Sequence, residues 1–235
     1  MKCVLNVGGC NKSIPIPMHY DGWQHLLLDI DRNSDVDIVC DARKIPSTIP
    51  MHLGTFDAVY CSHNLEHFHR HEIPHVLAGF KALIKDDGFI EIRVPNLQSV
   101  FDHMAKPCAS LGDVLYVSPA GPITALDIIF GMGRFIEQSG NDFMCHKTGF
   151  TAHSLAKTLF DNGLEILFVG AAQDLIAYAF KSNPTQAQID LLHLSGASES
   201  KPNPAAPAIK PTAHLPASPD PALLDANQSQ EVENV

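Results

Sequence analysis

The segment FDAVYCSHNLEH, residues 56–67, contains a short apolar run that leads directly into a polar loop. The same pattern occurs at residues 3–9, CVLNVGG, and at residues 26–29, LLLD, while Asp41 follows a further apolar run. Short apolar runs bounded by turn residues are typical of buried strands in a parallel sheet. The order of these runs, rather than any one of them, decides the predicted fold.

Seven strands and two helices account for most of the first 182 residues. The predicted helices cover residues 73–84 and 152–162, where apolar residues recur every three or four positions, and residues 86–88 are expected to end the first. The strands are expected at residues 3–7, 26–29, 37–40, 56–62, 89–94, 164–169 and 175–180. Strands that alternate with helices predict an α/β domain with parallel strands and crossover connections.

Composition limits both the domain count and the partners. The 235 residues, 45% of them hydrophobic, are enough for one well-buried core. With 26 acidic and 16 basic residues the formal net charge is −10, so binding to nucleic acid is not expected. No apolar run is long enough to span a membrane and the first residues do not form a signal peptide, so a cytoplasmic protein without a membrane partner is expected.

The composition changes near residue 195. From residue 196 onward the chain is rich in Pro, Ala and Ser and contains no aromatic residue. Such a segment buries too little apolar surface to offset the entropy of ordering it. The sequence therefore predicts a folded domain at residues 1–195 and a disordered tail at residues 196–235.

A glycine pair and an acidic residue have the spacing of a nucleotide site. Gly8 and Gly9 follow the first strand, and Asp29 lies twenty positions after Gly9, at the end of the second. In doubly wound folds such glycines let the backbone approach a ligand, and the acidic residue accepts hydrogen bonds from ribose hydroxyls. The alternative is that both features are ordinary turns, because the full three-glycine motif is missing.

Taken together, these segments resemble the class I S-adenosylmethionine-dependent methyltransferases, specifically the type 11 subgroup. The matching segments are LNVGG at residues 5–9, LDID at 28–31, DARKIP at 41–46, residues 56–68 with their LEH, and IKDDG at 84–88 before the strand FIEI. The resemblance implies a Rossmann-like, mostly parallel seven-stranded sheet whose last strand is antiparallel. It also implies S-adenosylmethionine as the cofactor, bound at the carboxyl ends of the strands.

The resemblance assigns a role to several residues. Gly8 and Gly9 match the loop that faces the amino acid part of the cofactor, and Asp29, or Asp31 beside it, matches the acidic residue that holds the ribose. Asp41, with Ala42 next to it, matches the position that recognises adenine, and Ser62 and His63 match the stretch near the methionine end. For each acidic residue the alternative is a solvated turn residue at a strand end.

The chain departs from this family directly after the glycine loop. Prolines 15 and 17 exclude the long helix that normally follows the glycine loop, which predicts weaker cofactor binding. Residues 96–148, long and rich in Gly and Pro, are the expected substrate-binding or lid insertion.

Histidines suggest both a catalytic base and a competing metal site. His63 and His67 are the candidate bases, with His146 as a further candidate. The same residues form an H-x-x-E-H pattern in which two imidazoles on one helical turn bind zinc, and Glu137 is a conceivable third ligand. Because the pattern coincides with the strand-to-helix junction of the methyltransferases and no cysteines are paired, no metal is expected.

The sequence thus predicts a methyltransferase that acts on a small molecule or a glycan-type acceptor. One alternative is a cofactor-binding module without turnover, favoured by the incomplete glycine loop. A zinc hydrolase and a nicotinamide-dependent oxidoreductase are the remaining alternatives, the latter disfavoured because only two glycines remain of the pyrophosphate loop. The sequence does not indicate the oligomeric state.

Overall fold

The computed structural model describes residues 1–194 except residues 33–34, 119, 141 and 172. The predicted tail, residues 196–235, lies outside the described residues. Within the described part of the chain, no helix combines the length and the apolar character needed to cross a membrane.

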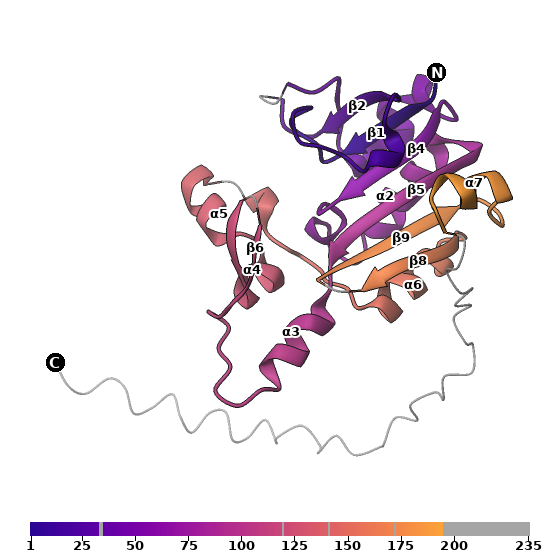
Figure 1. Ribbon diagram of the computed structural model, residues 1–235. Helices are drawn as coiled ribbons and strands as arrows, with labels where there is room; N and C mark the ends of the chain where they lie inside the picture. The colour runs from indigo at the N-terminus through magenta and orange to yellow at the C-terminus, as the bar shows by residue number, and fades with distance from the viewer. Residues whose placement is uncertain (33–34, 119, 141, 172, 195–235) are drawn as a thin grey trace, which may run out of the picture. The chain divides into compact units, whose positions relative to one another are not determined.

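A seven-stranded sheet forms the centre of the domain (Figure 1). Its order is β3-β2-β1-β4-β5-β9-β8, and β9 is antiparallel to both of its neighbours while β1 to β5 pair in parallel. The strands are β1 (Cys3–Val7), β2 (Gln24–Asp29), β3 (Ile38–Val39), β4 (Phe56–Ser62), β5 (Ile84–Pro95), β8 (Glu165–Ala171) and β9 (Asp174–Phe180). The strand order reverses between β1 and β4, which is where open α/β sheets bind their ligands.

Both predicted helices are present as α2 (Ile73–Leu83) and α6 (Ala152–Asp161). The prediction that residues 86–88 end the first helix is wrong. The helix α2 ends at Leu83, and β5 begins at once with Ile84. Ile84 is fully buried and pairs with Phe56, and the register then shifts before Phe89 pairs with Ala58. Residues 85–88 are therefore an irregular part of a long strand.

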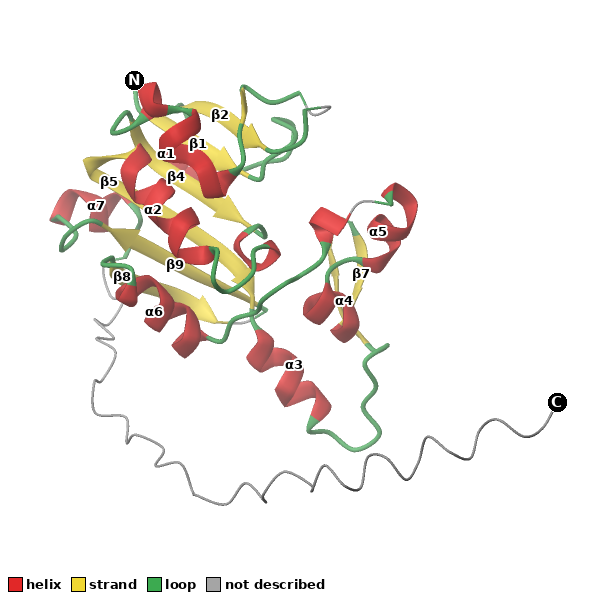
Figure 2. Ribbon diagram, turned by 180° about the vertical axis from the view of Figure 1, so that it is seen from behind, coloured by secondary structure: helices red, strands yellow, loops and turns green. Residues whose placement is uncertain are grey.

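The two faces of the sheet are covered in different ways (Figures 1 and 2). The helices α1 (Ile45–Thr48), α2 and α6 lie on the face seen in Figure 2 and pack there on an aliphatic core. The short helices η1 (Met18–Tyr20) and α7 (Gln186–Leu191) lie on the face seen in Figure 1. This second core is largely aromatic, with Tyr20, Tyr60, Phe89, Tyr178 and Phe180 among its buried residues.

The chain after β1 forms no long helix, as expected from its prolines. Only the three-residue 3-10 helix η1 is found there, and Tyr20 stacks on Phe89 with 6.1 Å between the ring centroids. The same segment surrounds a buried carboxylate: Glu91 accepts hydrogen bonds from Tyr20 Oη and His19 Nε2, both at 2.9 Å, and from Arg93 Nε at 2.7 Å. Aromatic rings and one polar network thus take the place of a helix.

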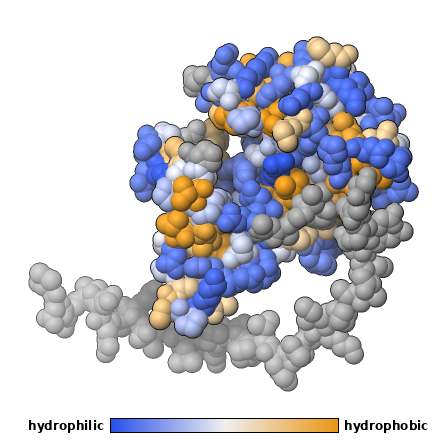
Figure 3. Space-filling model, in the orientation of Figure 1, coloured by the Kyte–Doolittle hydropathy of each residue, from blue (hydrophilic) through white to orange (hydrophobic). Residues whose placement is uncertain are grey.

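Residues 96–148 form an insertion that begins after β5 and ends where Phe150 bridges to Asn96. The insertion contains α3 (Leu97–Met104), β6 (Val114–Ser118), β7 (Gly121–Thr124), α4 (Ala125–Phe130), α5 (Gly133–Ser139) and the 3-10 helix η5 (Asp142–Met144). It has a small core of its own around Val100 and Ile128. Its surface also carries hydrophobic groups, orange in Figure 3, with Val117 75% and Phe130 58% exposed.

Candidate functional site

A pocket of about 230 Å³ lies at the carboxyl ends of β1, β2 and β3. Its lining brings together residues that are far apart in sequence: Val7, Gly8, Leu28, Asp29, Ile30, Cys40, Asp41, Ala42, Arg43, Asn64, His67, Phe68, Glu72, Asp142, Phe143 and Lys147. Four of the residues expected to bind the cofactor are among them, namely Gly8, Asp29, Asp41 and Ala42. The pocket also includes one candidate base, His67, and residues of the insertion.

Backbone geometry requires glycine at position 8. Its φ is +83°, which residues with a side chain rarely adopt, and its N–H donates to the carbonyl of Leu28 at 2.8 Å. A Cβ there would lie 2.4 Å from Asn64 Nδ2, so β1 and the loop after β4 approach each other as closely as glycine allows. Gly9 does not line the pocket, and a Cβ on it would meet the Asn6 side chain.

Asp29 ends β2 and directs a half-buried carboxyl group toward this pocket. Its Oδ1 accepts a hydrogen bond from the Asp31 amide at 2.8 Å. Burial raises the pKa of Asp29 despite this hydrogen bond. Such a group can accept further hydrogen bonds from neutral hydroxyls, which is the chemistry that a ribose offers.

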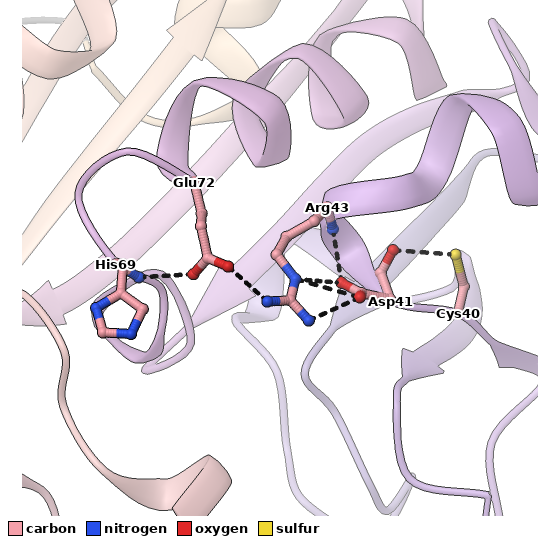
Figure 4. Close-up of polar contacts among 5 residues, drawn as sticks. All are labelled: Cys40, Asp41, Arg43, His69 and Glu72. Carbon is pink, nitrogen blue, oxygen red and sulfur yellow. Dashed lines mark hydrogen bonds and ion pairs between the residues drawn. The ribbon is translucent and has the colours of Figure 1, made fainter.

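Asp41 and Glu72 hold a guanidinium group between them (Figure 4). Asp41 caps the 3-10 helix η2 (Ala42–Lys44) by accepting from the Arg43 amide at 3.0 Å, and its carboxylate also pairs with the Arg43 side chain at 2.8 Å. Arg43 reaches on to Glu72, whose other oxygen accepts from the His69 amide at 2.9 Å. Hydrogen bonding to Arg43 outweighs burial and lowers the pKa of Asp41.

Asn64 provides an unused acceptor in the pocket. Its Oδ1 is buried and has no hydrogen-bond partner. Buried amide oxygens are normally paired, so an unpaired one in a pocket suggests a ligand that donates to it. Lys147 and Phe143, which come from the insertion, lie in the same lining.

Next to the pocket, three imidazoles surround a buried carboxylate. The Glu66 side chain is 1% exposed, and neither of its oxygens has a hydrogen-bond partner. Its Oε1 lies 3.6 Å from His63 Nδ1 and 3.9 Å from His146 Nε2. The Glu66 backbone carbonyl accepts from the amides of Lys147 and Thr148, which fixes the end of the insertion over this group.

His63 is the most strongly perturbed of these imidazoles. Burial opposes its charged form, but Asp174, at 3.5 Å from Nε2, and Glu66 outweigh that effect and raise the pKa of His63 to about 10. The ring is therefore an imidazolium at neutral pH and a hydrogen-bond donor. It has to lose that proton before it can act as a base.

His67 and His146 are oriented by backbone carbonyls. His67 contacts the carbonyls of Cys145 through Nδ1 and of His63 through Nε2, both at 3.1 Å. His146 contacts the carbonyl of Ile128 through Nδ1 at 2.8 Å, which leaves Nε2 directed at Glu66. Burial lowers the pKa of His146, so this ring is neutral at physiological pH.

The helical form of the H-x-x-E-H interpretation is wrong. His63 follows β4 with a φ of +49°, and only Leu65–His67 form a turn, the 3-10 helix η4. The two histidines therefore do not lie on one helical turn. Glu137 is exposed on α5 and is not part of the group formed by Glu66, His67 and His146, whose ligand atoms lie within 4.8 Å of one another.

Ser62 and His63 lie outside the lining of the pocket, although the sequence placed them beside the cofactor. Asn64, the next residue, reaches it instead. Sequence reasoning also missed Arg43 and Glu72, whose pairing joins segments 29 residues apart. The charged residue after Asp41 was the one available signal, since a capping carboxylate often pairs with a nearby cation.

No protein-family model and no curated protein matches the chain. Several solved structures are similar to it. The PH0226 protein from Pyrococcus horikoshii OT3 is 12% identical, with a TM-score of 0.50 over 77% of this chain and 83% of that one. A SAM dependent methyltransferase from Archaeoglobus fulgidus is 16% identical, with a TM-score of 0.46 over 76% and 85%.

The CMeT domain of the citrinin polyketide synthase is 12% identical, with a TM-score of 0.48 over 78% of this chain. The match covers 47% of that structure, so this chain spans about half its length.

Identities this low show a shared fold and nothing finer. The strand order and the single antiparallel strand β9 confirm the predicted architecture. The chain has the Rossmann-like α/β fold of class I methyltransferases.

Proposed function

We propose that this chain is an S-adenosylmethionine-dependent methyltransferase. The observation that carries the proposal is the convergence of Gly8, Asp29, Asp41 and Ala42 on one pocket at the ends of three adjacent strands. Those residues match the family's cofactor positions in order. Membership of the type 11 subgroup stays a prediction.

The polar groups of the pocket suit this cofactor. Asp29 offers carboxylate oxygens to the ribose hydroxyls. The unpaired Oδ1 of Asn64, beside Gly8, suits the ammonium group of the methionine part. When bound, the cofactor supplies an electrophilic methyl group, and the task of the protein is to hold an acceptor in line with it.

The size of the pocket suggests that the insertion moves. Ligand pockets usually measure about 300–1,000 Å³, and this one is smaller. Phe143 and Lys147, which line it, belong to the insertion, so opening of that segment would enlarge the site. Lid segments of this kind often admit substrate and then exclude water.

The acceptor is proposed to be a small molecule or a glycan, bound between the pocket and the insertion. His63 and His67 are the proposed proton acceptors for a weak nucleophile. His67 lines the pocket, while His63 lies in the adjacent cluster. Asp174 and Glu66 keep His63 protonated, so His67 is the better placed of the two.

A binding module without turnover is the second candidate. The shortened segment after β1, with η1 in place of a long helix, favours it. In the class I methyltransferases the helix after the glycine loop presents N–H groups to the ligand. In this chain the single turn η1 would have to do the same. Binding without catalysis would satisfy every contact proposed above.

Calorimetry on the full chain tests cofactor binding. S-adenosylhomocysteine, the demethylated product, should bind with a 1:1 stoichiometry and NAD should not. Asp29→Ala should weaken that binding about 10- to 100-fold, because charge-assisted hydrogen bonds contribute about 1.5–3 kcal/mol. Asp31→Ala is the matched control and should have a smaller effect.

A screen of methyl acceptors then separates the two candidates. Incubation with labelled S-adenosylmethionine and panels of sugars, small metabolites and peptides should yield a labelled product. Cofactor binding that depends on Asp29, without any product, would favour the binding module. If neither S-adenosylmethionine nor its product binds, both candidates fail.

A further inference from the structure

Glu66 is a buried carboxylate whose side chain accepts no hydrogen bond, although imidazoles lie within ion-pair distance of it. Its side chain is 1% exposed, and both oxygens are without hydrogen bonds. Removing an ionised carboxylate from water costs several kcal/mol unless it is paired or coordinates a metal. His63 supplies part of this pairing from 3.6 Å, but neither oxygen has a partner at bonding distance, and a metal ion would supply one.

The groups nearest to Glu66 are imidazoles held slightly too far away for hydrogen bonds. His63 Nδ1 and His146 Nε2 lie 3.6 and 3.9 Å from Oε1. Two ligands that share a tetrahedral Zn²⁺ at about 2.0–2.1 Å are themselves about 3.3 Å apart. Of the proposed ligands, Glu66 Oε1 and His146 Nε2 are 3.9 Å apart, which is closer to the spacing of two ligands around an ion than to a direct hydrogen bond.

We propose that Glu66, His67 and His146 form a binding site for a divalent transition metal, with Zn²⁺ the ion that suits it best. One ligand atom from each residue lies within 4.8 Å of the other two, and closure around an ion needs movements of about an ångström. Two imidazoles and one carboxylate are a common zinc ligand set, and they leave a coordination position open.

A backbone carbonyl already orients His146 as a metal site requires, whereas His67 has to release one carbonyl contact. A histidine ligand usually donates its second ring N–H to a carbonyl, which fixes the ring and raises its basicity. His146 Nδ1 makes that contact to Ile128, so Nε2 is free for the metal. His67 contacts one carbonyl with each nitrogen, at Cys145 and at His63, and keeps one of these contacts when the other nitrogen turns to the ion.

The site differs from the one suggested by the H-x-x-E-H pattern. In that interpretation His63 and His67 hold the metal and the glutamate stays free to activate water. Here Glu66 is a ligand, and the third ligand comes from the insertion, 80 positions after Glu66. The expectation that the chain binds no metal rested on the pattern and the cysteines alone, neither of which includes His146.

His67 also lines the cofactor pocket, so the ion would lie at the edge of that pocket. Its open position could hold and polarise an oxygen of the acceptor. This role rests on the proposed methyltransferase function, whereas binding of the metal does not. The two claims therefore fail separately.

The test uses the full chain, freed of metal with a chelator and titrated with Zn²⁺ in the absence of cofactor. One Zn²⁺ per chain should bind. Co²⁺ in its place should give visible absorption bands typical of nitrogen and oxygen ligands, without the intense near-ultraviolet band of a thiolate. Cys145→Ser should leave this spectrum unchanged.

Four variants locate the site. Glu66→Gln and His146→Gln should each weaken Zn²⁺ binding about 100-fold or more, because each removes a ligand. His63→Gln, which tests the competing pattern, and His71→Gln, an exposed histidine nearby, should bind as the wild type does. Circular dichroism of the metal-free variants shows whether each is folded.

Three outcomes would overturn the proposal. The wild-type chain could bind no Zn²⁺ at about 100 μM. Binding could be lost in His63→Gln and retained in His146→Gln, which would favour the competing pattern. Binding could also persist in folded Glu66→Gln and His146→Gln, which would place the ion elsewhere.

Discussion

Glu66 and Glu91 are both almost completely inaccessible to solvent, yet their surroundings are opposite. Glu91, at the centre of the sheet, accepts hydrogen bonds from Tyr20, His19 and Arg93. Glu66, beside the pocket, accepts none through its side chain. The first carboxylate is therefore hydrogen-bonded by the fold itself, whereas the second has only imidazoles at 3.6 and 3.9 Å.

This difference separates a structural group from a functional one. Buried carboxylates are retained when they are paired, because the desolvation cost is then offset. The Glu91 network lies among the aromatic residues of the second core, so it belongs to the core. Glu66 lies where the insertion meets the sheet, and the absence of hydrogen bonds to its side chain is the observation on which the proposed metal site rests.

The largest effect on stability is expected at Glu91. Glu91→Ala leaves Arg93 and the Tyr20 hydroxyl without their partner and opens a cavity, and should lower the free energy of unfolding by about 3–5 kcal/mol. Urea unfolding measures this loss. Glu91→Gln keeps the shape and should lose less. A loss below about 1 kcal/mol in Glu91→Ala would show that the network is dispensable.

Binding of Zn²⁺ should have the next largest effect on the free energy of unfolding, and only in chains that retain Glu66. At a free concentration of 100 times its dissociation constant, Zn²⁺ should stabilise the wild-type chain by about 2.7 kcal/mol. Thermal unfolding with and without the ion measures the shift. His146→Gln should show no such stabilisation, and an equal shift in that variant would contradict the proposed ligand set.

Asp57 is a third carboxylate, for which we expect an effect on stability between those of Glu91 and Glu66. It is largely buried near the start of β4 and is paired with Lys85. It accepts from the Cys3 amide and from Lys85, both at 2.8 Å, and these contacts outweigh burial and lower its pKa. Asp57→Asn should therefore lose about 1.5 kcal/mol at pH 7.

The sign of this effect with pH follows from the lowered pKa. The contribution of Asp57 is fully present above its unfolded value, near 4, and is lost as the pH falls through the lower folded value. Urea unfolding at pH 7 and at pH 3 should show the gap between wild type and Asp57→Asn narrowing in acid. A gap of constant size would mean that the carboxylate charge does not matter.

The smallest effect is expected at Glu66. In the metal-free chain Glu66→Gln should change the free energy of unfolding by less than about 1 kcal/mol, because the loss of the ion pair with His63 is offset by the lower desolvation cost of the neutral amide. The same substitution at Glu91 is the matched comparison. Equal losses at the two positions would show that the nearby imidazoles already satisfy Glu66.

The sequence alone predicted the architecture and five of the sixteen residues that line the pocket. The alternation of apolar runs with turn residues predicted all seven strands of the sheet, and the helices α2 and α6, because burial on both faces imposes that pattern. Gly8 and Asp29 could be assigned from their places at the ends of two strands, whereas Asp41 and Ala42 were assigned because they match the family's pattern. Parallel strands bring such positions to one edge whatever the rest of the chain does.

Only the tertiary structure decided the rest. The pairing of Arg43 with Glu72 and the approach of His146 to Glu66 join segments 29 and 80 positions apart. Such contacts leave no periodicity in the sequence, because they depend on how the insertion folds back over β4. The insertion itself has mixed, short elements whose apolar residues serve a small separate core, so their spacing gave no signal. Strand ends are set by local pattern, whereas the partners of a buried charge are set by the whole fold.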